Sequence, residues 1–181
     1  MDDRKVRPGD LASPIALKTI DDREFDSTDL SGKPYMISFF RFATCPFCNL
    51  RVNQLVSRFS EFDQNFTIVA IFDSPLGHLQ YHAKGHKVPF PIMADETKSF
   101  YKIYGIEKSI GGMLKGMITR FPTMMKGILK GHIPFPIKGN LFTMPADFLV
   151  DRDGLIHTAY YGIDEGDHLP IEQIKEFLGN L

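Results

Sequence analysis

The sequence predicts an α/β protein with a mixed central sheet, helices on both faces of the sheet, and a basic, Met-rich helical insertion. Two apolar runs, residues 35–40 and 66–72, predict buried strands, and between them apolar residues recur with helical spacing. Such a β-α-β unit forms a parallel pair with a right-handed crossover. Residues 146–150 and 155–160 flank an Asp-Gly turn and predict a hairpin, after which Pro170 begins a last helix. The chain therefore begins β-α-β and ends β-β-α.

Shorter elements fill the rest of the chain. We expect an irregular stretch at residues 1–14 and a small hairpin at residues 15–25. Two short helices are expected at residues 78–87 and 97–104. Pro89 and Pro91 end the first of these helices, because proline cannot continue a helix, and Gly105 closes the second.

Length and composition indicate one globular domain, residues 1–181, with an insertion at 108–140. The chain is 43% hydrophobic and 24% charged, which argues against disorder, and its net charge of −1 argues against a nucleic-acid-binding polyelectrolyte. No apolar run approaches the ~20 residues that span a bilayer. The first ten residues lack the apolar segment of a secretory signal, so we expect a cytoplasmic protein.

The insertion differs in composition from the rest of the chain. It holds six Lys and Arg residues, no Asp or Glu, and four of the eight methionines, and its apolar residues have helical spacing that Pro122 should break. Lysine beside Met, Ile and Phe is typical of helices at a membrane surface. A helical pair that packs its apolar face on the sheet has the same pattern, and we favour that interpretation. A homodimer interface is a further alternative.

The two cysteines of the chain, Cys45 and Cys48, form the sequence Cys-Pro-Phe-Cys directly after the first predicted strand. At a helix start this spacing brings the two Cα atoms to about 5–6 Å, within disulfide reach. Pro46 suits the first helical position, and the free N–H groups there favour the Cys45 thiolate, as does the positive charge of Arg41. We expect Cys45 to attack and the more buried Cys48 to form the disulfide.

A metal site is the alternative for these side chains. A structural zinc site needs four ligands, and the chain has no second cysteine pair, so we expect no metal. His78, His82 and His86 recur every four residues, which is a metal-ligand spacing, but we expect a solvated helix face. His132 and His168 are expected at the surface or in loops.

The cysteine motif, the strand that Met144-Pro145 leads and the Asp-Gly turn at residues 151–154 resemble the thioredoxin fold. Further segments resemble the alkyl hydroperoxide reductase/thiol-specific antioxidant family, the peroxiredoxin-like proteins; they are Gly9-Asp10, residues 29–33, Phe40-Arg41 and residues 148–151. The resemblance covers nearly the whole chain except residues 108–140.

The resemblance implies that Pro145 is a cis-proline facing Cys45. We accordingly predict that Thr44, Pro46, Met144 and Pro145 contact the substrate.

Two departures from the family pattern affect the predicted chemistry. The places of the family's proline and threonine, seven and three before the cysteine, hold Ser38 and Phe42, and Pro145 stands near the place of its arginine. Arg41 and Thr44 are the residues that could replace them. Thioredoxins hold a buried aspartate where this chain has Phe39, so the base for the second thiol stays open between water and a residue of the insertion.

We therefore predict a thiol–disulfide oxidoreductase that uses Cys45 and Cys48 as its redox couple, with no other cofactor. A thiol peroxidase that passes through a sulfenic acid at Cys45 is the first alternative, and a non-enzymatic redox-sensing or membrane-docking module is the second. The expected partners are an electron-donating thiol protein or small thiol and a disulfide or hydroperoxide substrate, with no nucleic acid. A homodimer and a weak membrane contact through residues 108–140 stay open.

Overall fold

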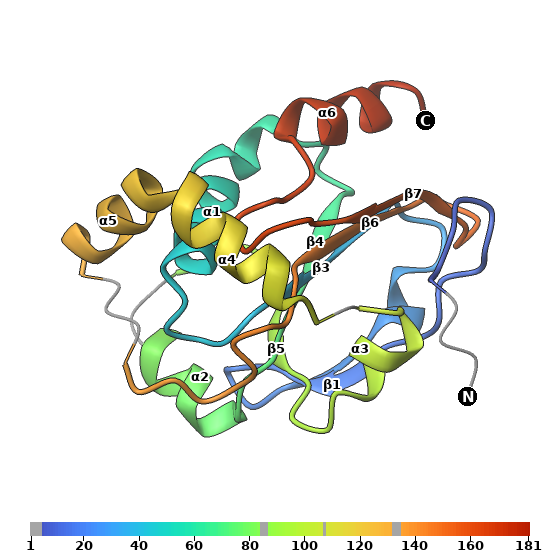
Figure 1. The fold of residues 1–181 in the computed structure, drawn as a ribbon. Coiled ribbons are helices and arrows are strands. Elements are labelled where there is room, and N and C mark those ends of the chain that lie inside the picture. The colour runs from blue at the N-terminus through green and yellow to red at the C-terminus, as the bar shows by residue number, and fades with distance from the viewer. Residues whose placement is uncertain (1–4, 84–86, 107, 132–134) are drawn as a thin grey trace.

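The computed structural model describes residues 5–83, 87–106, 108–131 and 135–181 (Figure 1). The strands are β1 (Ala16–Lys18), β2 (Glu24–Asp26), β3 (Tyr35–Phe40), β4 (Thr67–Phe72), β5 (Ile92–Ala94), β6 (Ala146–Val150) and β7 (Ile156–Tyr161). The α-helices are α1 (Pro46–Arg58), α2 (Leu76–Ala83), α3 (Ser99–Ile103), α4 (Ile110–Thr119), α5 (Phe121–Leu129) and α6 (Ile171–Gly179). Short 3₁₀ turns cover Ser27–Leu30 and Phe59–Glu61.

A five-stranded mixed sheet of order β5-β4-β3-β6-β7 forms the centre of the molecule. β3 runs parallel to β4, with Tyr35 opposite Thr67 and Phe40 opposite Phe72, which confirms the predicted β-α-β unit. β6 runs antiparallel to β3 and to β7, as the predicted hairpin requires. The small β1–β2 hairpin is also confirmed. All six residues of β3 are buried, because this strand is central and both sheet faces are covered.

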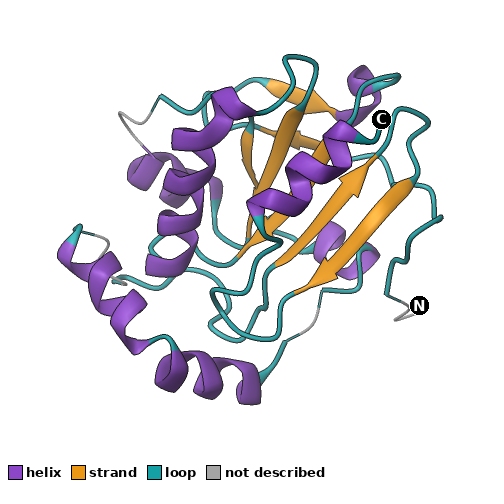
Figure 2. Cartoon of the chain, turned by 90° about the horizontal axis from the view of Figure 1, so that it is seen from above, coloured by secondary structure: helices purple, strands orange, loops and turns teal. Residues whose placement is uncertain are grey.

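The core has two layers, one on each face of the sheet. Alternate residues of a strand point to opposite faces, so Met36 and Phe40 join the cluster beneath α1 and α6, whereas Ile37 and Phe39 join the cluster with α3. Figures 1 and 2 show α1 and α6 on one side of the sheet, with α3 and the β1–β2 hairpin on the other. Both cysteines belong to the α1 side.

Two short elements differ from the prediction. β5 was not predicted; it pairs parallel to β4 between Pro91 and Asp95, where three apolar residues are too few to show a period. α2 begins at Leu76, and the end of the predicted helix, including His86, lies outside the described residues.

The insertion holds two helices, α4 and α5, and the break between them lies close to Pro122, as the sequence predicts. Arg120 leaves the helical conformation, with φ −110° and ψ 18°, and Pro122 lies in the first turn of α5. In the parts of the chain that the structure describes, no helix has both the length and the apolar character needed to cross a membrane.

Candidate active site around two buried thiols

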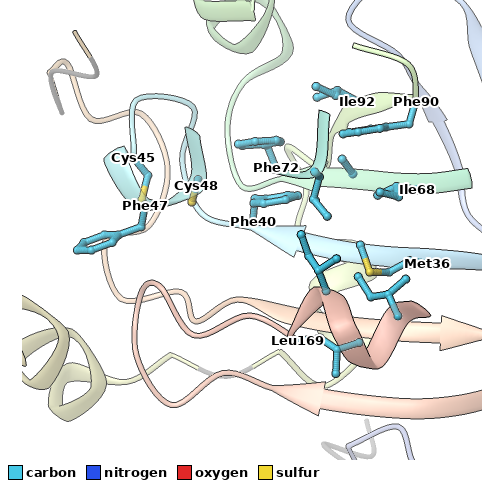
Figure 3. Close-up of a cluster of buried hydrophobic side chains, with 14 of the residues drawn as sticks. Met36, Phe40, Cys45, Phe47, Cys48, Ile68, Phe72, Phe90, Ile92 and Leu169 are labelled. Carbon is cyan, nitrogen blue, oxygen red and sulfur yellow. The ribbon is translucent and has the colours of Figure 1, made fainter. Parts of the chain in front are cut away.

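Cys45 occupies the junction between β3 and α1. It is the N-cap residue of α1, with φ −65° and ψ 120°, and Pro46 follows at the first helical position, as the sequence predicts. Since no side chain caps this helix end, the backbone N–H groups of the first turn are available to the Cys45 sulfur. Figure 3 shows both cysteines and Phe47 at one edge of the apolar cluster to which they belong.

The surroundings separate the acidities of the two thiols. Burial alone raises the pKa of Cys45, but the hydrogen bond from Cys48, the charge of Arg41 and the N–H groups of Cys48 and Phe47 together lower it to about 6. Burial and the neighbouring Cys45 raise the pKa of Cys48 well above its usual range. Near neutral pH the pair therefore holds one thiolate, at Cys45, and one thiol.

Arg41 is the charged group nearest the pair. Its Nη1 donates to Cys45 Sγ at 3.6 Å, and its backbone N–H donates to Cys48 Sγ at 3.3 Å. Nη2 donates to the carbonyl of Leu141, and the guanidinium lies 5.3 Å from the ring centre of Phe42. The Arg41 side chain is buried, so its charge acts on the thiolate with little screening.

Both cysteines have no exposed surface, at 0%. The expectation that Cys45 would lie more open than Cys48 is therefore wrong. Residues 135–143, which we call the return segment, pass over the loop before Cys45: the carbonyl of Pro136 accepts from Thr44 Oγ1 at 3.4 Å. The Lys138 carbonyl accepts from Ser74 Oγ at 3.1 Å. Sequence patterns are local, so they do not reveal this cover.

Asp73 anchors the end of the return segment. Its carboxylate accepts from Thr143 Oγ1 at 2.7 Å and from the backbone N–H of Asn140 at 3.2 Å, and Lys98 Nζ lies 2.9 Å from it. Asp73 directly follows β4, and Arg41 directly follows the parallel strand β3. A charged residue directly after a buried strand was the sequence signal for this anchor, and it was missed.

The four predicted substrate-contacting residues are all buried, so none meets solvent in this conformation. Thr44 lies beneath the return segment, and Pro46 lies against Gly127 of α5. Met144 and Pro145 lie at the start of β6, with Met144 beneath α4. All four residues are thus buried, Thr44 and Pro46 on either side of Cys45, and Met144 and Pro145 directly before β6.

The predicted cis bond before Pro145 is wrong. Among the described residues the cis peptide bond is Phe135–Pro136, and the Met144–Pro145 bond is trans. The Pro145 carbonyl accepts from the N–H of Gly162 at 2.9 Å, which places the proline at a strand start, where a trans proline is tolerated.

Glu165 is a buried carboxyl group that belongs to no motif of the sequence. It is 2% exposed, and its Oε2 has no hydrogen-bond partner among the described residues. Burial raises its pKa, while the charge of Arg41 opposes the shift. Gly116 of α4 lies directly over this carboxyl, and any side chain there would collide with it. A carboxyl in this setting can hold or release a proton close to Arg41.

Another buried carboxylate, Asp147 on β6, faces the α1 side of the sheet. It accepts from Ser38 on β3, from the backbone N–H of Leu169 at 2.8 Å, and pairs with His168 Nδ1 at 3.0 Å. Burial raises the pKa of Asp147, but its interactions, chiefly with His168, leave the pKa lowered. His168 lies in a loop, one of the two positions expected for it, but it is buried and not at the surface. His132 lies outside the described residues. Where thioredoxins carry an aspartate, this chain has Phe39, and its buried aspartate lies on the neighbouring strand.

The two described histidines of α2 lie in contact. The ring centres of His78 and His82 are 4.5 Å apart, and His78 Nδ1 lies 3.3 Å from Ser74 Oγ. Within the described ranges, no three His, Cys, Asp or Glu side chains group closely enough to hold a metal ion.

Sheet order, helix layers and a dithiol at the first strand–helix junction define a thioredoxin-fold protein. The AhpC/TSA family model matches residues 8–159, and the chain belongs to that family. It is 27% identical to the chloroplastic peroxiredoxin Q of Sedum lineare over 117 aligned residues. This alignment covers 64% of this chain and 62% of that protein. It is 26% identical to the chloroplastic peroxiredoxin Q of Populus jackii, in an alignment that covers 64% of this chain and 54% of that protein. The matched stretch thus spans less than two thirds of these relatives.

Solved structures confirm the thioredoxin-like, peroxiredoxin-like fold. A thiol peroxidase from Chromobacterium violaceum superposes with a TM-score of 0.67 at 17% identity, over 98% of this chain and 88% of that one. A peroxiredoxin-like protein from Aquifex aeolicus gives 0.70 at 10% identity, over the same shares. A putative thiol:disulfide interchange protein DsbE from Chlorobium tepidum gives 0.62 at 16% identity, over 97% and 98%.

Proposed function

We propose that the chain is a thiol-dependent oxidoreductase in which Cys45 is the nucleophile and Cys48 the resolving thiol. The observation that carries the proposal is the separation of the two acidities: the pKa of Cys45 is lowered to about 6, while that of Cys48 is raised. A thiolate paired with a neutral thiol is the starting state for dithiol–disulfide exchange. Arg41, 3.6 Å from the sulfur, keeps Cys45 ionised.

In disulfide exchange, the Cys45 thiolate attacks one sulfur of a substrate disulfide, and the other sulfur leaves as a thiolate. Cys48 then loses its proton and attacks Cys45 Sγ, which releases the second substrate thiolate and leaves a Cys45–Cys48 disulfide. The dithiol gives up two electrons, the substrate disulfide takes them, and the released thiolates take up protons. The couple carries the electrons itself, so the step needs no further cofactor. A thiol protein or small thiol then reduces the disulfide.

Access to Cys45 requires the return segment to move. In the closed conformation this segment is tied to Thr44, Arg41 and Asp73. Its displacement uncovers the loop before Cys45, and we propose that Thr44, Pro46, Met144 and Pro145 then contact the substrate. Residues 135–139 of the segment are exposed, and exposed segments open locally at a lower free-energy cost than the buried core.

A thiol peroxidase is the second candidate, and membership of the AhpC/TSA family together with the Arg41–Cys45 contact favours it. The Cys45 thiolate attacks the terminal oxygen of a hydroperoxide, the O–O bond breaks, and the leaving alkoxide takes a proton. Cys48 then attacks the sulfenic acid at Cys45, releasing water and forming the same disulfide. Arg41 would stabilise the charge that develops on the oxygens.

Two cysteine variants test the proposal. Cys45→Ser is expected to abolish turnover, whereas Cys48→Ser is expected to accumulate a mixed disulfide that mass spectrometry detects. Turnover that is unchanged in Cys45→Ser contradicts the mechanism. Stopped-flow oxidation of the wild-type chain separates the two candidates: oxidation by hydrogen peroxide many orders faster than that of a free thiol favours the peroxidase, and slow oxidation favours disulfide exchange.

A further inference from the structure

Helices α4 and α5 pack on the rest of the molecule through glycine. A side chain at Gly112 would meet Met144 Sδ at 2.8 Å, and one at Gly127 would meet Pro46 Cβ at 2.7 Å. Gly116, one turn after Gly112, covers the Glu165 carboxyl. These three glycines are the buried residues of the two helices. The expectation that this pair packs its apolar face on the sheet is therefore wrong, because the inward face is built of the smallest residues.

Most of the large apolar side chains of both helices face outward as a consequence, although Met124 packs against the core on the α1 side. Ile118 is 78% exposed and Leu129 is 82% exposed. The face continues over neighbouring residues; we define the docking face as Ile110, Leu114, Met117, Ile118, Phe121, Met125, Leu129 and, from the return segment, Phe135. Contiguous exposed apolar surface of this kind marks an interaction site and is uncommon on a free molecule. Figure 2 shows the two helices following each other along one edge of the molecule.

Lys and Arg residues alternate along the chain with these apolar residues, and residues 108–140 contain no acidic residue. Arg120 is paired with Asp164 at 2.6 Å. Within the described residues no ion pair holds Lys115, Lys126 or Lys130, which are exposed. Free lysines beside outward Ile, Leu, Met and Phe match the composition of helices that lie in the interface of an anionic bilayer.

A second copy of the chain fits this face less well than a lipid surface. In a two-fold dimer the same patch meets itself, so the lysines of both copies would be brought together without an acidic partner. We propose that the docking face binds the surface of a membrane containing anionic lipids, with its apolar side chains at the headgroup–acyl boundary and its lysines at the headgroups. The proposal does not depend on the redox chemistry of Cys45.

Vesicle flotation of the full chain tests this proposal. We expect the protein to float with vesicles of phosphatidylcholine mixed with phosphatidylglycerol, and to float much less with phosphatidylcholine alone or at high salt. Ile118→Ser combined with Leu129→Ser is expected to lower the bound fraction about tenfold or more. The matched control combines Leu11→Ser with Tyr81→Ser, two side chains that are similarly exposed, at 72% and 74%, but lie elsewhere, and it is expected to bind like the wild type.

Several results would overturn the proposal. They are absence of wild-type flotation, equal flotation with neutral and anionic vesicles, and equal loss of binding in the docking-face and control variants. Light scattering of the same proteins adds a check: a wild-type dimer that Ile118→Ser with Leu129→Ser abolishes, together with no vesicle binding, would assign the face to a second copy instead. All substituted residues are exposed, and unchanged thermal unfolding of the variants confirms that any loss of binding is not a loss of fold.

Discussion

Replacement of Arg41 by Gln tests whether its charge keeps Cys45 ionised. At the observed 3.6 Å and an effective dielectric constant of about 20, a full positive charge at Nη1 would favour the thiolate by about 4–5 kcal/mol. The positive charge is shared over the whole guanidinium, which reduces the free energy by which Arg41 favours the thiolate to about 2 kcal/mol. Each pKa unit corresponds to about 1.4 kcal/mol. We therefore expect the pKa of Cys45 to rise from about 6 to roughly 7.5 or higher.

The assay is the rate of Cys45 alkylation by iodoacetamide against pH, followed by mass spectrometry of the Cys45 peptide. The midpoint of the profile reports the thiolate population even where the cover slows the absolute rate. Arg152→Gln, on the exposed turn of the β6–β7 hairpin, is the matched control and should leave the midpoint unchanged. An Arg41→Gln midpoint equal to that of the wild type would refute the assignment of this charge.

Three further predictions concern stability and access. Folding lowers the pKa of Cys45, so ionisation of this thiol stabilises the folded, reduced chain. The gain in the free energy of unfolding, at most about 3 kcal/mol, is fully present above about pH 8.5 and is lost as the pH falls to about 6. Cys45→Ser should therefore remove this pH dependence from the free energy measured by urea unfolding. Gly116→Ala should destabilise the fold by about 1–3 kcal/mol because its Cβ collides with a buried carboxyl. Gly111→Ala, whose Cβ would meet only Ser109 Oγ at an ordinary 4.0 Å, should be neutral or slightly stabilising in the same assay. Asp73→Ala should loosen the return segment and speed alkylation of Cys45 several-fold, while Asp153→Ala should not; equal rates in the two variants would remove Asp73 as the anchor.

The sequence predicted the elements whose signals are local. The apolar runs of β3 and β4 and the 3–4 spacing of α1 identify a β-α-β unit without any tertiary information, and Pro46 places Cys45 at the helix start. The Asp-Gly turn identifies the β6–β7 hairpin in the same way. These local signals position the reactive sulfur, which is why the site could be located from the sequence.

The features that were missed depend on contacts between distant residues. The burial of Cys45 follows from the return segment, about ninety residues further along the chain, and no spacing near the cysteine reports it. Glu165 stands in no motif, and it is recognised only beneath Gly116.

The prediction of how α4 and α5 are oriented was wrong for a different reason. Helical spacing of apolar residues is the same whether the apolar face points inward or outward. Gly112 and Gly116, four residues apart, were the one sequence signal for close packing through the opposite face.

The proposed function depends on an ionised Cys45 that attacks the oxidised substrate and then forms a disulfide with Cys48, so that the two thiols together give up two electrons. The most direct test is the pH dependence of disulfide formation when the reduced wild-type chain reacts with oxidised glutathione. We expect mass spectrometry to find a Cys45–Cys48 disulfide whose rate of formation rises with a midpoint near pH 6. A midpoint near the ordinary cysteine value of about 8.5, or a reaction that never joins the two sulfurs, would contradict it.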